Sequence, residues 1–162
     1  MVLGMSIHVF TLIHVLISLV GIVSGLVVMY GFLTNKRLNR WTAVFLVTTA
    51  LTSLTGFLFP FTGVTPAIKL GIISLVVLAV AIITRYPLRL AWRKTYVITA
   101  CVALYFNVFV LVVQSFEKVP SLEAIAPTQK EPPFAIAQIV VLVAFIILTI
   151  FAVKKFHGDS RD

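Results

Sequence analysis

The residues of this chain that could do chemistry are neutral polar side chains set inside long apolar runs. His14 and Ser18 are four residues apart and Thr52 and Thr55 are three apart, so each pair shares one face of a helix. Imidazole, hydroxyl and amide groups can hydrogen-bond a small ligand, a lipid headgroup, a quinone ring or one another. The candidate ligand-binding residues, which we call the polar set, are His14, Ser18, Thr52, Thr55, Asn107, Gln114 and Gln138.

Patterns for catalysis and metal binding are weak in this sequence. The motifs G-x-S-x-G, H-E-x-x-H, G-x-G-x-x-G and Walker A do not occur. His14 and Ser18 have the spacing of a dyad, but no acid is at hand to orient the imidazole. A single cysteine, Cys101, and scattered histidines give no metal site. We therefore predict no catalytic residue and no metal ion, which favours a protein that is not an enzyme.

A redox cofactor stays open as an alternative, because one imidazole is enough to hold a haem iron from one side. His14 lies well inside an apolar run, whereas His8 is six residues away on another face of the same helix. Haem held by two histidines of this chain is therefore disfavoured. A haem with His14 as one axial ligand, or a quinone in contact with His14, is the form of the hypothesis that we keep.

The composition places these residues in a membrane protein. The chain has 162 residues, of which 60% are apolar and 11% charged, and its mean hydropathy is +1.13. A soluble domain is about half apolar and about a quarter charged, and this chain could not hide so much apolar surface from water. The net charge of +8 does not indicate a nucleic-acid partner, because the cations lie in short clusters between apolar runs. The expected partner is the lipid bilayer.

Five apolar runs are long enough to cross a bilayer as helices, which takes roughly 20 residues each. They lack the alternation that is typical of an outer-membrane β-barrel. We therefore predict an all-α fold, a polytopic helix bundle with five transmembrane helices that forms one membrane domain over residues 1–162. The predicted spans are about 7–33, 41–59, 67–84, 96–116 and 134–153.

The loops between the spans predict the orientation. Ten of the thirteen cations fall in segments that five spans would place on one side of the membrane. The positive-inside rule makes this side cytoplasmic, so the N-terminus is predicted outside and the C-terminus inside. The outer loop 117–133 contains four prolines and is expected to be a stiff lid, partner surface or connector. The ten inner cations are Lys36, Arg37, Arg40, Arg85, Arg89, Arg93, Lys94, Lys154, Lys155 and Arg161.

Two further groups have spacings that indicate a role at the membrane. Gly21 and Gly25 form a GxxxG pattern, which is typical of close helix packing in bilayers. Arg85, Arg89 and Arg93 are four residues apart, so a helix through them would present all three to anionic lipid headgroups. Pro87 argues against a regular helix in that segment.

The predicted orientation places the polar set in the outer half of the bilayer, and no charged residue lies near the middle of any span. Such groups either bond helices together or line a pocket for a lipid or cofactor.

The sequence favours a non-catalytic membrane subunit that packs against other membrane proteins or a second copy of itself. The alternatives are a redox protein that binds haem or quinone and a small uncoupled transporter or channel. We expect a multi-pass protein of the plasma membrane, in particular the bacterial inner membrane.

Overall fold

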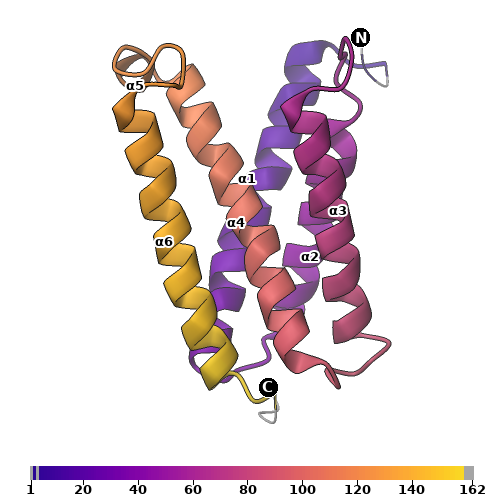
Figure 1. Ribbon diagram of the computed structural model, residues 1–162. Helices are drawn as coiled ribbons and strands as arrows, with labels where there is room; N and C mark the ends of the chain where they lie inside the picture. The colour runs from indigo at the N-terminus through magenta and orange to yellow at the C-terminus, as the bar shows by residue number, and fades with distance from the viewer. Residues whose placement is uncertain (1, 3, 159–162) are drawn as a thin grey trace.

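The computed structural model describes residue 2 and residues 4–158, and this part of the chain folds into helices joined by short connections (Figure 1). The predicted all-α class is confirmed. Arg161, one of the ten cations assigned to the inner side, lies outside the described residues. The six helices of the described part are α1 (Ile7–Leu33), α2 (Asn39–Gly56), α3 (Pro66–Arg85), α4 (Arg93–Lys118), α5 (Pro120–Glu123) and α6 (Pro132–Lys155).

Local side chains start two of the long helices. The Ser6 hydroxyl accepts a hydrogen bond from the N–H of Val9 at 3.3 Å and caps α1. The Thr65 hydroxyl caps α3 in the same way, with the N–H of Ile68 at 3.3 Å. Pro66 fits the first turn of α3, because the N–H that proline lacks would have no partner within the helix there.

Four helices of the described chain are long and apolar enough to cross a membrane, namely α1, α3, α4 and α6. An 18-residue window of each has a mean hydropathy of 2.6, 2.6, 2.3 and 3.0, respectively. They mark the chain as a multi-pass membrane protein in contact with the lipid bilayer. Helix α2 has 18 residues but falls outside this group. Six Ser and Thr side chains, together with Asn39 and Arg40 at its start, make it more polar than the others. A bilayer crossing by α2 therefore stays a prediction.

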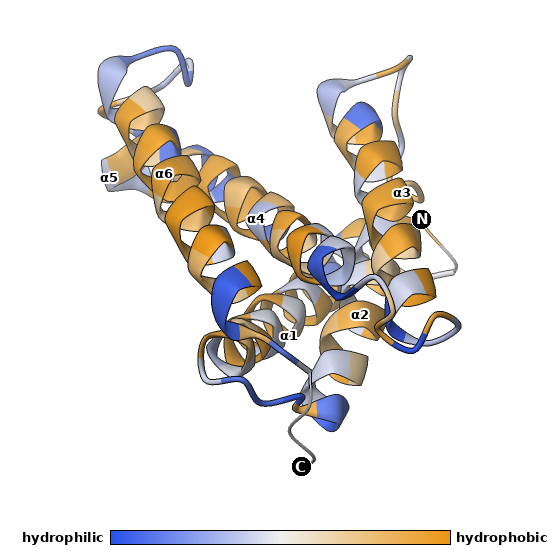
Figure 2. Cartoon of the chain, turned by 60° about the horizontal axis from the view of Figure 1, so that its bottom comes forward, coloured by the Kyte–Doolittle hydropathy of each residue, from blue (hydrophilic) through white to orange (hydrophobic). Residues whose placement is uncertain are grey.

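The long helices run alternately in opposite directions, so that connections of the same kind gather at one end of the bundle. The N-terminus and α5 lie at one end and the C-terminus lies at the other (Figure 1). Figure 2 shows that the sides of the helices are mostly hydrophobic and that hydrophilic segments lie at helix ends and connections. We call the end with residues 34–38, 86–92 and 156–158 the basic end, and the end with residues 57–65 and 119–131 the opposite end.

The tightly packed core lies toward the basic end. Phe32 of α1, Tyr96 of α4 and Phe156 after α6 form an aromatic cluster with ring centroids 5.0–6.4 Å apart. Tyr96 and Phe156 are completely buried. Burial of such large side chains makes this cluster a main contributor to the cohesion of the bundle.

Toward the opposite end, the described helices bury few side chains. α1 buries Phe10 alone ahead of Gly21, and α6 buries Phe145 alone ahead of Ala152. α2 buries no residue after Thr49. The helices thus meet closely at the basic end and loosely in the half that carries the polar set.

Candidate functional site

His14 joins α1 to the end of α2 in the loosely packed half of the bundle. Its Nδ1 lies 2.7 Å from Oγ1 of Thr55. The half-buried imidazole stands edge-on to the ring of Phe59, with 5.2 Å between centroids, and Phe59 contacts Phe10 in the same way at 5.0 Å. Two members of the polar set, His14 and Thr55, are therefore in direct contact beside an aromatic pair.

The hydrogen bonds of Thr55 favour one tautomer of His14. Thr55 donates its single hydrogen to the carbonyl of Leu51 at 2.7 Å, so its oxygen accepts the bond from the imidazole. Nδ1 is then the protonated nitrogen, and Nε2 keeps its lone pair. His14 can accordingly accept a hydrogen bond, or ligate a metal, through Nε2.

Asn107 ties α4 to α2 near Gly21 of α1. The Asn107 Nδ2 donates to Oγ1 of Thr49 at 3.0 Å, and Thr49 is completely buried. A Cβ atom added at Gly21 would lie 3.2 Å from Oγ1 of Thr48 and 3.4 Å from that of Thr49. The absence of a side chain at residue 21 thus leaves room for three helices to meet at this amide–hydroxyl pair.

Gly25 lies one turn further along α1, where the helices are closest. A Cβ atom at this position would sit 2.5 Å from Cδ1 of Leu104 and 2.9 Å from two ring carbons of Phe45. Both distances are far below normal contact, so a larger residue at position 25 would require Leu104 and Phe45 to shift. The packing role expected from the GxxxG pattern stays a prediction.

Two members of the polar set bond within their own helices. Ser18 donates to the carbonyl of Val15 at 2.7 Å. Gln114 is exposed, and its Nε2 donates to Oε2 of Glu117 at 3.3 Å. Asn107 and Gln114, which the spacing places on the same side of the helix, therefore do not bond a common partner.

The last two members carry atoms that lack a partner. Gln138 of α6 donates to the carbonyl of Phe109 at 3.3 Å and so links α6 to α4, but its Oε1 is buried without a hydrogen bond. Oγ1 of Thr52 is likewise buried without one. The polar set as a whole does not converge on one pocket. It bonds α1 to α2, α2 to α4 and α4 to α6, and leaves two polar atoms unsatisfied.

The three arginines assigned to lipid headgroups do not lie on one helix face. Residues 86–92 form turns, because Pro87 interrupts the helix and Arg89 adopts a left-handed backbone with φ 46°. Arg89 is exposed and Arg93, the first residue of α4, is half-buried. Contact of these two with lipid headgroups stays a prediction.

Arg85 departs from the expected role, because its side chain turns inward. It is 7% exposed, its Nη2 donates to Oδ1 of Asn39, and its guanidinium carbon lies 5.3 Å from the ring centroid of Tyr96. The side chain thus connects the end of α3 to the starts of α2 and α4. A buried position of this kind corrects the idea that Arg85 faces headgroups.

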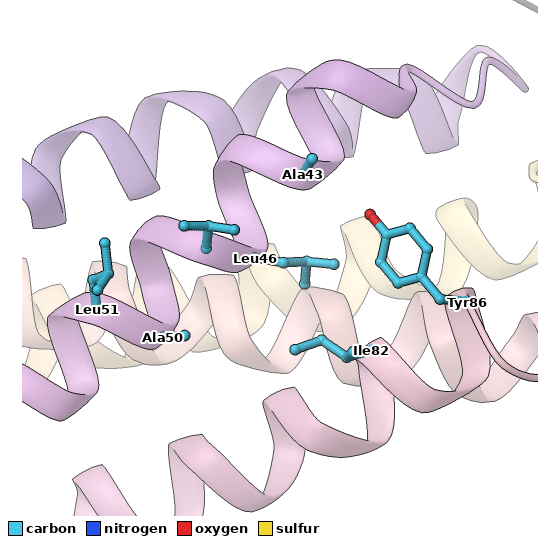
Figure 3. Close-up of a pocket in the computed structure, with 7 residues that line it drawn as sticks. Ala43, Leu46, Ala50, Leu51, Ile82 and Tyr86 are labelled. Carbon is cyan, nitrogen blue, oxygen red and sulfur yellow. The ribbon is translucent and has the colours of Figure 1, made fainter.

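Two hollows in the described surface lie away from the polar set. The first is an apolar groove of about 380 Å³ between α2 and α3, lined by residues that include Leu46, Ala50 and Ile82, with Tyr86 at one end (Figure 3). The second, of about 440 Å³, lies at the basic end where α4 begins. The described residues contain no cluster of three His, Cys, Asp or Glu side chains that could hold a metal ion.

Sequence reasoning missed several residues that hold the helices together. Thr42 and Thr49, both completely buried, are seven residues apart on one face of α2, and that spacing was a usable signal. The contact between Ser53 and Ser74, 3.4 Å between hydroxyl oxygens, links α2 to α3 and has no counterpart in the sequence pattern.

Comparison of the chain with protein-family models, with curated proteins and with solved structures gives no match.

Proposed function

We propose that this chain is a non-catalytic subunit of a membrane assembly, with five spanning helices, the N-terminus outside and the C-terminus inside. Its location would be the plasma membrane, in particular the bacterial inner membrane. The outer half of the bundle would be completed by a neighbouring membrane protein or a second copy of the chain, with a lipid or cofactor as the other candidate for that space.

The observation that carries this proposal is the uneven packing of the bundle. The half with the polar set buries few side chains, and Oγ1 of Thr52 and Oε1 of Gln138 lack hydrogen bonds there, as Nη1 of Arg85 and the Tyr96 hydroxyl do in the packed half. An unsatisfied polar atom in hydrocarbon costs several kcal/mol by order of magnitude. Additional contacts from another molecule would remove this cost, whereas lipid chains alone cannot hydrogen-bond these atoms.

The internal bonding of α2 supports its assignment as a fifth span. Thr48 and Thr55 donate to the carbonyls of Val44 and Leu51, at 2.6 and 2.7 Å, so part of the polarity of α2 is satisfied within the helix. Its 18 residues would extend about 27 Å, close to the thickness of the hydrocarbon layer. With α2 as a span, ten of the thirteen cations would face one side, and Lys69, Lys118 and Lys130 the other.

Photo-crosslinking in native membranes tests whether the outer half has a protein neighbour. A photoreactive phenylalanine analogue replaces Val110, which lies on α4 between Asn107 and Gln114 and is 39% exposed. The matched position is Ile98, which is 44% exposed on the same helix but near the basic end. We expect discrete protein adducts from position 110 and mainly lipid adducts from position 98. A second, differently tagged copy of the chain identifies self-association, and a lone monomer without adducts at position 110 would contradict the proposal.

The state of His14 favours one second candidate, a redox protein. With Nδ1 bonded to Thr55, the free lone pair of Nε2 suits a haem iron or the hydroxyl of a reduced quinone, but it cannot donate to a quinone carbonyl. Optical spectra and solvent extracts of the purified protein test this candidate. A Soret band, or a bound quinone, that disappears in His14→Ala but not in His8→Ala would support it, and preparations without either would remove it.

A further inference from the structure

The pocket at the basic end brings together residues that are far apart in the sequence. It is lined by His157 and by residues where α4 begins, among them Trp92, Arg93, Lys94 and Thr95. The backbone N–H of His157 donates to Oδ1 of Asn35 at 2.7 Å. This bond holds the segment after α6 against the connection between α1 and α2, and thereby completes the pocket wall.

The pocket is positively charged and lacks a carboxylate from the described residues. Arg93 and Lys94 line it, whereas the three described carboxylates, Glu117, Glu123 and Glu131, lie toward the opposite end. Helix α4 also begins without a side-chain cap and without an acid in its first turn. The positive end of its dipole therefore adds to the two cations, an arrangement that an anion in the pocket would stabilise.

Aromatic residues indicate that the pocket lies at the depth of the lipid headgroups. Trp92 is 64% exposed and Tyr86 is 49% exposed at this end of the bundle. Exposed Trp and Tyr side chains of membrane proteins prefer the interface between hydrocarbon and water. The apolar side chain of Leu90 lines the same pocket and could contact the start of an acyl chain.

We propose that this pocket binds the phosphate of an anionic phospholipid, with Arg93 and Lys94 as the charged partners and Trp92 beside the glycerol region. Cations near a membrane surface each strengthen binding to anionic lipid roughly fivefold, so loss of both should weaken it by at least about tenfold. The site lies away from the polar set and does not depend on the proposed outer-half partner.

Native mass spectrometry of the full chain in nanodiscs with equal phosphatidylglycerol and phosphatidylcholine tests this proposal. We expect preferential retention of phosphatidylglycerol by the natural sequence and at least about tenfold less in the double variant Arg93→Gln/Lys94→Gln. The control Lys69→Gln/Lys130→Gln removes the same charge at the opposite end and should keep the preference. The swap Arg93→Lys/Lys94→Arg keeps the local charge and should therefore also keep the preference for phosphatidylglycerol. Melting temperatures recorded for all four proteins show whether each variant is folded.

Three results would overturn the proposal. The first is equal retention of both lipids by the natural sequence. The second is an equal loss of phosphatidylglycerol in Arg93→Gln/Lys94→Gln and in the control Lys69→Gln/Lys130→Gln, which would indicate a non-specific effect of net charge. The third is saturable binding of inorganic phosphate in nanodiscs of pure phosphatidylcholine without any lipid preference, which would assign the pocket to a soluble phosphate compound.

Discussion

The guanidinium of Arg85 lies over the ring of Tyr96, 5.3 Å from its centroid, in the interior of the basic end. The same side chain donates to Asn39, so three helix termini meet at one cation. A buried charge is costly unless other groups compensate it. An aromatic face and an amide oxygen do so in part, while Nη1 of Arg85 is buried without a hydrogen bond. We therefore regard Arg85 as a structural link of the bundle.

Arg85→Lys is expected to destabilise the protein by about 1–2 kcal/mol, because an ammonium cannot bond Asn39 and cover the Tyr96 ring with the planar geometry of a guanidinium. The control is Arg89→Lys, since Arg89 is exposed in the same connection and should tolerate the change. Unfolding in bicelles, followed for both variants, measures the difference. Equal stability of the two variants would show that the buried contacts of Arg85 do not contribute to the free energy of unfolding.

Thr55→Val is expected to weaken the contact between α1 and α2 by about 0.6–2 kcal/mol, because it removes the acceptor of the His14 imidazole at nearly constant volume. Thr11→Val is the matched control, since its hydroxyl bonds only to the carbonyl of Ile7 in its own helix. A nitrogen-detected NMR spectrum of His14 also reports whether Nδ1 carries the hydrogen. Protonation at Nε2 instead would contradict the assignment of the imidazole and remove the basis of the redox candidate.

Gly25→Ala is expected to destabilise the protein by about 1–3 kcal/mol, because its methyl group would overlap Leu104 and Phe45. Gly56→Ala provides the comparison, since an added Cβ there meets only Cε1 of His14 at 3.8 Å. The thermal unfolding of both variants in the same detergent tests the prediction. A neutral Gly25→Ala would mean that α1, α2 and α4 are further apart than described.

The loop before α6 should respond to acid through Glu131. Desolvation acts to raise the pKa of this carboxyl, but hydrogen bonds from the Thr128 hydroxyl and from backbone N–H groups outweigh it and hold the pKa below its usual value. A lowered folded-state pKa means that the loop contacts stabilise fully above the ordinary pKa and are lost as the pH falls through the lowered value. Thr128→Val should shift the Glu131 titration upward in carbon-detected NMR. An unchanged titration would show that the hydroxyl does not bond the carboxylate.

The sequence predicted the helices well because the cause of each is local. Apolar runs of about 20 residues, the caps Ser6 and Thr65 and the prolines at helix starts all act within a few residues of where they stand. Asn39, Arg40 and six hydroxyl side chains lower the hydropathy of α2, so length and hydropathy alone give four candidate spans and not five.

The arrangement of the candidate site could be predicted only in part. The predicted orientation placed His14 and Thr55 in the same half of the bilayer, and the structure joins them. Residue spacing could not show that Ser18 and Gln114 would bond within their own helices. The inward turn of Arg85 depends on Asn39 and Tyr96, which approach only after three helices pack. Contacts of this kind between distant segments leave no pattern in a single sequence.

The proposed topology is tested most directly by labelling single cysteines on intact cells with a membrane-impermeant maleimide. In a Cys101→Ala background, the positions are Lys36 before α2, Thr62 after α2, Thr128 in the outer loop and Lys155 at the end of α6, all exposed. We predict labelling at 62 and 128 on intact cells, and at 36 and 155 only after the membrane is opened. Labelling of 36 and 62 from the same side would show that α2 does not cross the bilayer and would contradict the five-span orientation.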